Sequence, residues 1–250
     1  MEMIKIDSVV IGEGRPKIIL PIVESTSEAI LLAVAQANEL PCDLVEWRVD
    51  HFNEAADYQS VAAVSEQIKA VLNKPLLITF RSSREGGVLE ESDVAYGERY
   101  RYLLEQGQVD LLDLELFMPD ELVKELTELA HAKNVKVVMC HHNFERTLSK
   151  EELVTYLVKM DQMQADICKI AMMPQEPQDV LTLMNATLAA KEQVKRPMIT
   201  MSMGGLGTVS RIAGQLFGSV ATFGIADKAS APGQLPIQQL EELLKLLELN

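Results

Sequence analysis

Short apolar runs rich in leucine and β-branched residues alternate with longer amphipathic stretches along the whole chain. The runs lie at residues 17–22, 43–49, 76–80, 110–116, 135–140, 166–171, 197–202 and 219–224. Each is followed by a stretch with apolar residues at helical spacing. Eight strand-then-helix units predict an α/β fold with parallel strands. In a chain of 250 residues they indicate a closed (β/α)8 TIM barrel.

A doubly wound open sheet is the alternative arrangement for such units. No strand–GxGxxG–helix unit occurs near the start of the chain to favour it. An extra extended segment, roughly residues 4–14, precedes the first unit, and we expect it to form a hairpin that closes the barrel bottom. No linker or low-complexity stretch divides the chain. We therefore expect one catalytic domain over residues 1–250.

Several helix starts can be predicted from local sequence. Ser25-x-x-Glu28 and Ser149-x-x-Glu152 have the form of capping boxes. Pro119 and Pro236 stand where a first helical turn can begin.

Net charge, apolar runs and cysteine spacing limit which partners the protein can bind and in which cell compartment it functions. The formal net charge is −14, which disfavours binding to nucleic acid or to anionic membranes. No apolar run approaches the roughly 20 residues of a membrane span, and the N-terminus lacks the features of a secretory signal. Cys42, Cys140 and Cys168 match no disulfide or zinc spacing. These features predict a cytoplasmic protein.

Charged or titratable residues recur on one face of five consecutive predicted strands, while the opposite face is apolar. Burying charges costs several kcal/mol each unless they are paired, and barrel enzymes keep their chemistry at the carboxyl ends of the strands. We therefore interpret this face as the lining of a functional barrel mouth. For Asp113 and Glu115, on the fourth predicted strand, the alternative to a functional role is a structural ion-pair network. The polar residues on this face are Glu46, Arg48, Thr79, Arg81, Asp113, Glu115, Cys140, His142 and Lys169.

Lys169 is the most informative single residue of this face. It lies inside an apolar run, where burial and the positive charges of Arg48 and Arg81 would favour a neutral amine. A neutral amine is the nucleophile that forms Schiff bases with ketones. His142 faces the same interior and can transfer protons near neutral pH. The alternative is a lysine that extends its amine to solvent at a strand end.

The adjacent His141 and His142 bear on metal binding. Neighbouring residues of a strand point to opposite faces, and no His-x-His or His-x3-His spacing occurs nearby. We therefore expect no metal at this site.

The two loops after the last predicted strands also contain polar residues that could bind a ligand. In residues 201–211, MSMGGLGTVSR, glycines precede a helix and could present N–H groups to an anion, with Arg211 to bind a carboxylate. Residues 228–236, KASAPGQLP, are long enough to form a lid, with Ser230 and Gln234 as its polar groups. A flexible turn and an ordinary surface loop are the alternatives.

Taken together, these motifs resemble one family across essentially the whole chain, the type I 3-dehydroquinate dehydratases. The stretches that carry the resemblance occur in order at barrel-unit spacing. Where the family usually has His-Asp-Phe, this chain has Asn143, which affects a minor partner of the histidine. The matching stretches are EWRVD (46–50), TFRSSREGG (79–87), HHNF (141–144), ADICKIAMMP (165–174), MSMGGLG with SR (201–211) and KASAPGQ (228–234).

The resemblance implies a homodimeric barrel, without metal or organic cofactor, that converts 3-dehydroquinate to 3-dehydroshikimate in the shikimate pathway. It implies that Lys169 forms the Schiff base, that His142 is the general acid and base of a syn elimination, and that Glu85 assists the histidine. It implies that Arg211 holds the substrate carboxylate. The positions implied to bind hydroxyls, order the site or close the lid are Glu46, Arg48, Arg81, Ser230 and Gln234.

Two other functions fit part of the pattern. A Schiff-base class I aldolase shares the barrel and the interior lysine, but usually acts on a phosphorylated substrate, for which no second lysine or phosphate cluster is present. A non-catalytic anion-binding barrel would need neither Lys169 nor His142. Fold alone does not decide between them.

Overall fold

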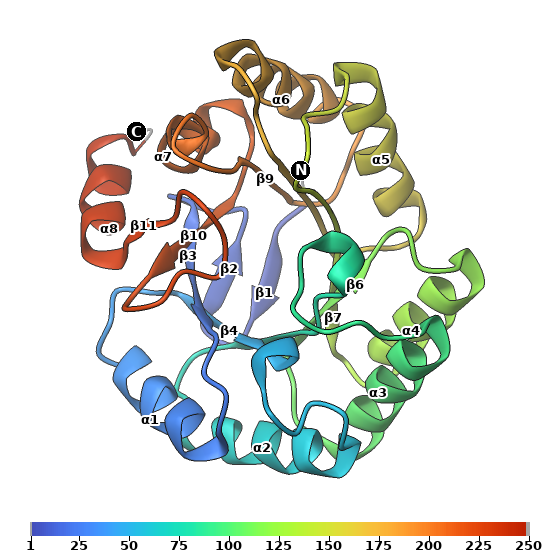
Figure 1. The fold of residues 1–250 in the computed structure, drawn as a ribbon. Coiled ribbons are helices and arrows are strands. Elements are labelled where there is room, and N and C mark those ends of the chain that lie inside the picture. Colours follow the sequence, from blue (N-terminus) through green and yellow to red (C-terminus); the bar gives the residue numbers. More distant parts are fainter. Residues whose placement is uncertain (1, 249–250) are drawn as a thin grey trace.

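Eight parallel strands form the centre of the molecule in the computed structural model, which describes residues 2–248 (Figure 1). The first seven strands pair in chain order, and the eighth pairs with the first. A parallel bridge between Met198 and Ser219 closes the ring. The (β/α)8 prediction is confirmed. The strands are β3 (Lys17–Ile22), β4 (Leu44–Arg48), β5 (Leu76–Thr79), β6 (Leu111–Glu115), β7 (Lys136–Asn143), β8 (Ile167–Met172), β9 (Met198–Ser202) and β10 (Ala221–Ile225).

The helices surround the strands (Figure 1). They are α1 (Ser27–Ala37), α2 (Tyr58–Val71), α3 (Asp93–Gln106), α4 (Asp120–Ala132), α5 (Lys150–Gln162), α6 (Pro177–Ala190), α7 (Thr208–Phe217) and α8 (Ile237–Leu246). Two short 3-10 turns, η1 (Val49–His51) and η2 (Ser83–Glu85), follow β4 and β5. None of the helices within residues 2–248 is long and apolar enough to cross a bilayer.

Strand alternation divides the apolar core into two layers, as the sequence predicts. Val45 and Trp47 of β4 belong to the outer layer, between the strands and the helices, where Trp47 is fully buried. Leu44 of the same strand belongs to the inner layer, inside the barrel. Towards the carboxyl ends of the strands the inward positions become polar, because Glu46 and Arg48 follow Leu44 at every second residue.

An N-terminal hairpin closes the bottom of the barrel, as predicted. It consists of β1 (Ile4–Ile6) and β2 (Val9–Ile11), which pair antiparallel. Ile4, Ile6 and Ile11 are buried in the inner layer, against apolar residues at the amino-terminal ends of the barrel strands. Water is thereby excluded from one end of the interior, so that the carboxyl end is the mouth.

The predicted helix starts are confirmed in part. Ser149 and Glu152 form the expected capping box at α5. The box predicted at Ser25 is wrong, since the cap of α1 is Thr26, whose hydroxyl accepts from the Ala29 N–H at 3.3 Å. A hydroxyl stands at both positions, so the local pattern does not fix the start to one residue. Pro119 and Pro236 directly precede α4 and α8.

Candidate active site

A pocket of about 450 Å³ opens at the carboxyl ends of the barrel strands. The nine site residues implied by the family resemblance line it, whereas Thr79, Asp113, Glu115 and Cys140 of the same predicted face do not. The nine are Glu46, Arg48, Arg81, Glu85, His142, Lys169, Arg211, Ser230 and Gln234. A concave pocket at the carboxyl end of a barrel is the usual place for a small-molecule site. The remaining wall is largely apolar, formed by Gly86, Phe144, Ala171, Met201, Met203, Phe223 and Ala231.

Lys169 projects from β8 into this pocket and is buried. Its amine Nζ lies 2.9 Å from Oδ2 of Asp113 and 3.9 Å from Oε1 of Glu46, and 4.8 Å from the centre of the Phe223 ring. Arg48 and Arg81 were expected to flank this amine and to favour its neutral form. The groups that pair with it in the structure are the two carboxylates.

Asp113 and Glu115 form the ion-pair network that the sequence analysis left open. Oδ1 of Asp113 lies 2.5 Å from Nη2 of Arg81, and Oε1 of Glu115 lies 2.9 Å from Nη1 of the same arginine. Burial alone would raise the pKa of Asp113, but Arg81 and Lys169 together lower it to about 2. Glu115 also accepts from the N–H and the hydroxyl of Ser82 at 2.8 and 2.6 Å. Asp113 thus fixes Lys169, and Glu115 fixes the loop after β5.

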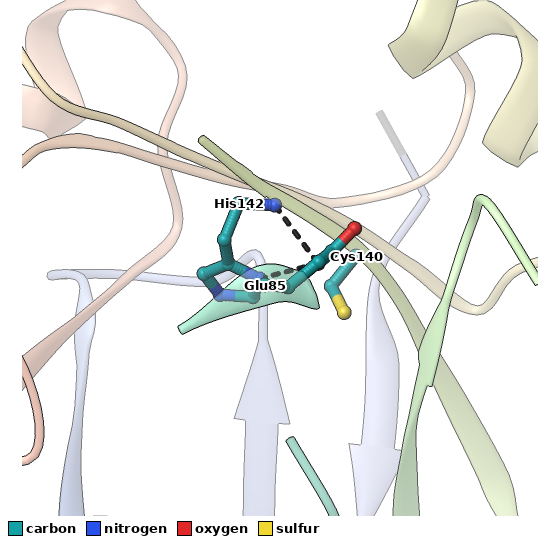
Figure 2. Close-up of side chains that lie close together, drawn as sticks. All are labelled: Glu85, Cys140 and His142. Atoms are coloured by element: carbon teal, nitrogen blue, oxygen red, sulfur yellow. Dashed lines mark hydrogen bonds and ion pairs between the residues drawn. The ribbon is translucent and has the colours of Figure 1, made fainter. Parts of the chain in front are cut away.

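His142 lies at the end of β7 beside Glu85 of η2 (Figure 2). Its ring Nδ1 is 3.0 Å from Oε2 of Glu85, and its main-chain N–H donates to the same oxygen at 3.0 Å. Burial, together with the charges of Arg81 and Lys169, lowers the pKa of His142 well below its ordinary value. The imidazole is therefore neutral at physiological pH. With Nδ1–H donated to Glu85, its Nε2 carries the free lone pair that a general base needs.

His141 also contacts Glu85, which the strand alternation did not predict. Its Nδ1 lies 2.8 Å from Oε1 of Glu85. Adjacent strand residues do leave on opposite faces, but η2 carries Glu85 over the end of β7, where one carboxylate reaches both rings. No local sequence signal specifies this loop path.

Glu85, Cys140 and His142 form the one group within residues 2–248 whose donor atoms lie close enough to hold a metal, within 4.8 Å of one another. The chemistry of this group does not suit a metal. Burial raises the pKa of the Cys140 thiol well above its ordinary value, so it does not supply a thiolate. A cation is already present, since Nη1 of Arg81 lies 3.1 Å from the Cys140 sulfur and 3.5 Å from the Glu85 carboxylate.

Arg211, on α7, is buried and has no carboxylate partner among residues 2–248. Its Nη2 donates to the Pro232 carbonyl at 3.0 Å, while Nε has no hydrogen-bond partner in the described part of the chain. Burial lowers the pKa of Arg211 to about 10, which still leaves it charged at neutral pH. A buried, unpaired guanidinium in a pocket is suited to bind an anion.

The segment 228–236 covers one side of the mouth. Ser230 and Gln234 are joined by two hydrogen bonds of 3.0 Å, and the Ser230 carbonyl accepts from Nη1 of Arg48 at 3.4 Å. The Gly204 N–H donates to the Pro232 carbonyl at 3.1 Å. The glycine-rich loop was expected to offer its N–H groups to an anion. At Gly204 that expectation is wrong, because its N–H group holds the lid segment.

The remaining predicted residues form hydrogen bonds and an ion pair around the pocket. The hydroxyl of Thr79 donates to Glu46 at 2.8 Å, and Arg48 forms a two-pronged ion pair with Asp50 at 2.7 and 2.8 Å. Oδ1 of Asn143 accepts from the Glu145 and Arg146 N–H groups at 2.9 Å each. The Asn143 side chain thus stabilises the loop that follows it. The side chain that hydrogen-bonds to the His142 ring is Glu85.

The sequence matches one protein family over most of its length. The model of the family described as type I 3-dehydroquinase matches residues 18–250. The 3-dehydroquinate dehydratase of Enterococcus faecalis is 47% identical over 252 residues, covering 100% of both chains. That of Listeria monocytogenes serotype 4a is 46% identical over 248 residues, covering 99% of this chain and 98% of the other.

Solved structures agree with the sequence match. The crystal structure of type I 3-dehydroquinate dehydratase from Clostridium difficile with covalently modified comenic acid superposes with a TM-score of 0.95. It is 41% identical and covers 98% of each chain. Fold, pocket and sequence therefore agree that this chain belongs to the type I 3-dehydroquinase family.

Proposed function

We propose that this protein is a hydro-lyase that converts 3-dehydroquinate to 3-dehydroshikimate in the shikimate pathway. Membership of the type I 3-dehydroquinase family supports this activity. The structural observation that carries the proposal is one pocket holding a buried lysine, a neutral histidine and an unpaired arginine. A neutral substrate would leave Arg211 without a counter-ion, whereas the carboxylate of 3-dehydroquinate provides one.

The first step is assigned to Lys169. Its Nζ attacks the C3 ketone carbon, and loss of one water gives a protonated imine, which withdraws electrons from C2. The attacking amine must be unprotonated. We assign the transfer of its proton to the Glu46 carboxylate at 3.9 Å, because the pKa of Asp113 is held at about 2. Phe223 at 4.8 Å shields the imine from bulk water.

His142 carries out the elimination. Its Nε2 lone pair removes the C2 proton, the C2–H electron pair moves towards the imine nitrogen, and an enamine forms. The enamine then expels the C1 hydroxyl, which takes the proton from His142 and leaves as water. One group serves both transfers because the elimination is syn. Water then releases the product from Lys169. Positioned acid–base catalysis of this kind contributes roughly 10²- to 10⁴-fold in rate.

Arg211 and the lid orient the substrate. Binding the carboxylate at Arg211 turns C2 towards His142, and such orientation lowers the barrier entropically. Ser230 and Gln234, which bond to one another without substrate, are the groups that exchange partners with substrate hydroxyls. Glu46, Arg48 and Arg81 hold the lysine and the rim in place.

A Schiff-base aldolase would use the same lysine. Family membership favours the dehydratase, and so does the absence of a free basic cluster for a phosphate among the pocket residues, where Arg48 and Arg81 are already paired with carboxylates.

We further propose that the active form is a cytoplasmic homodimer that needs neither a metal nor an organic cofactor. The poor fit of the Glu85–Cys140–His142 group to a metal supports the cofactor part. The buried, unpaired thiols of Cys42, Cys140 and Cys168 suit a reducing compartment. Sedimentation velocity in the presence and absence of a chelator, with activity measured on the same samples, tests the assembly and the cofactor together.

The activity itself is tested by adding purified protein to 3-dehydroquinate and following the ultraviolet absorbance of the conjugated enone product. Rapid product formation by the wild type, absent in Lys169→Met, supports the proposal. A folded wild-type protein that forms no product would contradict it, and cleavage of a carbon–carbon bond in a sugar phosphate would favour the aldolase.

A further inference from the structure

Both oxygens of the Glu85 carboxylate are held by histidines. Oε2 lies 3.0 Å from Nδ1 of His142, and Oε1 lies 2.8 Å from Nδ1 of His141. The contact to His141 is as short as a charge-assisted hydrogen bond. His141 does not line the pocket, so it acts on Glu85 from behind, on the side away from substrate.

The ring of His141 is fixed by aromatic packing. Its centre lies 4.7 Å from the ring of Phe117 and 5.5 Å from the ring of Tyr156, edge to face in both cases, and these two rings lie 5.0 Å from each other. The His141 side chain is only 13% exposed. An imidazole packed in this way keeps one edge towards Glu85. A histidine on the open surface would not be held in a single orientation.

The charge state of Glu85 depends on the groups around it. Arg81, in the loop after β5, lies 3.5 Å away, and Glu115 of β6 adds a like charge. The remaining neighbours come from β7 and are Cys140, His141 and His142. Burial raises the pKa of Glu85, and the hydrogen bond from His141 is the strongest effect that opposes it. A donor at His141 therefore favours the ionised carboxylate.

We propose that His141 is a positioning residue for the dehydration: it holds Glu85 ionised and oriented so that Glu85 accepts Nδ1–H of His142. An ionised Glu85 fixes the tautomer of His142 that has a free lone pair on Nε2. A protonated Glu85 would instead donate to Nδ1, the ring proton would move to Nε2, and His142 could not act as a base. This inference rests on the proposed function, because it concerns the same proton transfer.

Two substitutions separate the donor from the packing. His141→Phe keeps an aromatic ring between Phe117 and Tyr156 but removes the N–H, whereas His141→Asn loses the ring but keeps an amide N–H close to the position of Nδ1. We expect His141→Phe to lower kcat about tenfold, part of the roughly 10²- to 10⁴-fold of a positioned base, with KM little changed. The acid limb of its kcat/KM profile should move to higher pH, because Glu85 is then protonated more easily. His141→Asn should restore the wild-type profile and most of kcat.

Several results would overturn the inference. These are an unchanged kcat and pH profile in His141→Phe, an equal loss of kcat in His141→Asn, or an effect confined to KM. Thermal melting checks that each variant folds, and His141→Leu replaces His141→Phe if the latter does not fold. Wild-type protein is assayed in parallel. An inactive wild type rejects the proposed function, whereas an active wild type with an insensitive His141→Phe rejects only the role of His141.

Discussion

Two buried basic side chains in the pocket differ in how they are paired, and this difference supports the separate tasks that we propose for them. Lys169 is paired with Asp113 at 2.9 Å, so its amine is held in place until substrate arrives. Arg211 has no carboxylate partner among residues 2–248 and contacts only the Pro232 carbonyl and the Met201 sulfur. An unpaired buried charge is costly, and a substrate carboxylate removes that cost when it binds.

Substitution of Arg211 tests the second of these tasks. We expect Arg211→Ala to raise KM about 10- to 100-fold, because the substrate loses one or two hydrogen bonds to a charged group. The KM of Arg211→Lys should lie between those of Arg211→Ala and the wild type. Arg84→Ala, which removes an exposed arginine paired with Asp93, is the matched control and should leave KM unchanged. Steady-state kinetics with 3-dehydroquinate measure both. Unchanged KM and kcat in Arg211→Ala would remove this role.

The charge state of His142 predicts the pH dependence of the reaction. Because burial and then Arg81 and Lys169 lower its pKa below the ordinary 6.5, its base form persists into mildly acidic solution. The kcat/KM profile should stay level through pH 6.5 and fall only at lower pH. His142→Ala should lose roughly 10²- to 10⁴-fold in kcat. A titration of activity centred above pH 6.5, or a loss of less than about tenfold, would contradict the assignment.

Among the elements, the lid segment 228–236 depends on one glycine. Gly233 has φ +79°, and a Cβ there would lie 2.3 Å from the Gly204 carbonyl oxygen. The lid is thus packed against the glycine-rich loop after β9, and a side chain at Gly233 must displace one of the two.

Gly233→Ala should therefore weaken substrate binding. The left-handed backbone alone costs an alanine about 1 kcal/mol or more, and the clash adds to it, so KM should rise at least about fivefold. Gly14→Ala is the control, because Gly14 has φ +64° with no atom within 4 Å of the added Cβ and lies outside the pocket. A wild-type KM for Gly233→Ala, with Gly14→Ala unaffected, would show that the lid does not hold the substrate.

The elements also show which features the sequence could predict. Strand positions and their inward faces were predictable because alternation is a local property, and β6 places Asp113 and Glu115 inward as expected. The contact between Glu85 and His141 was not, since it depends on the path of η2 over the end of β7. The cap at Thr26 was missed for a smaller reason, namely that two adjacent hydroxyl residues give the same signal.

In the molecule as a whole, the excess of cations in the pocket lining is opposite in sign to the net charge of the chain. The chain has a net charge of −14, yet its pocket holds Arg48, Arg81, Lys169 and Arg211. Such local concentration of positive charge allows an acidic protein to bind a small anion. This concentration of cations could be predicted from the sequence, because β4, β8, α7 and the loop after β5 each supply one at the same end of the barrel. The pairing that leaves Arg211 without a carboxylate could not.

The same interior network contributes to global stability. Asp113 bridges Arg81 and Lys169, so Asp113→Asn should lower the free energy of unfolding by about 3–5 kcal/mol, the cost of breaking a buried ion pair. Since the pKa of Asp113 is lowered in the folded state from 3.8 to about 2, its contribution is complete above pH 4 and is lost between pH 4 and 2. Urea unfolding should therefore show the difference from wild type shrinking over that range.

The control for this experiment is Asp93→Asn, which breaks an exposed ion pair and should cost less than about 1 kcal/mol. A stability difference for Asp113→Asn that stays constant between pH 4 and 2 would mean that its carboxylate does not carry the effect.

We propose that catalysis passes through a covalent imine on Lys169, and borohydride reduction during turnover of 3-dehydroquinate, followed by peptide mass mapping, would trap it. We expect irreversible inactivation and a single reduced adduct on the peptide that contains Lys169, with no adduct in Lys169→Met. An enzyme that turns over 3-dehydroquinate yet is neither inactivated nor labelled at Lys169 would contradict it.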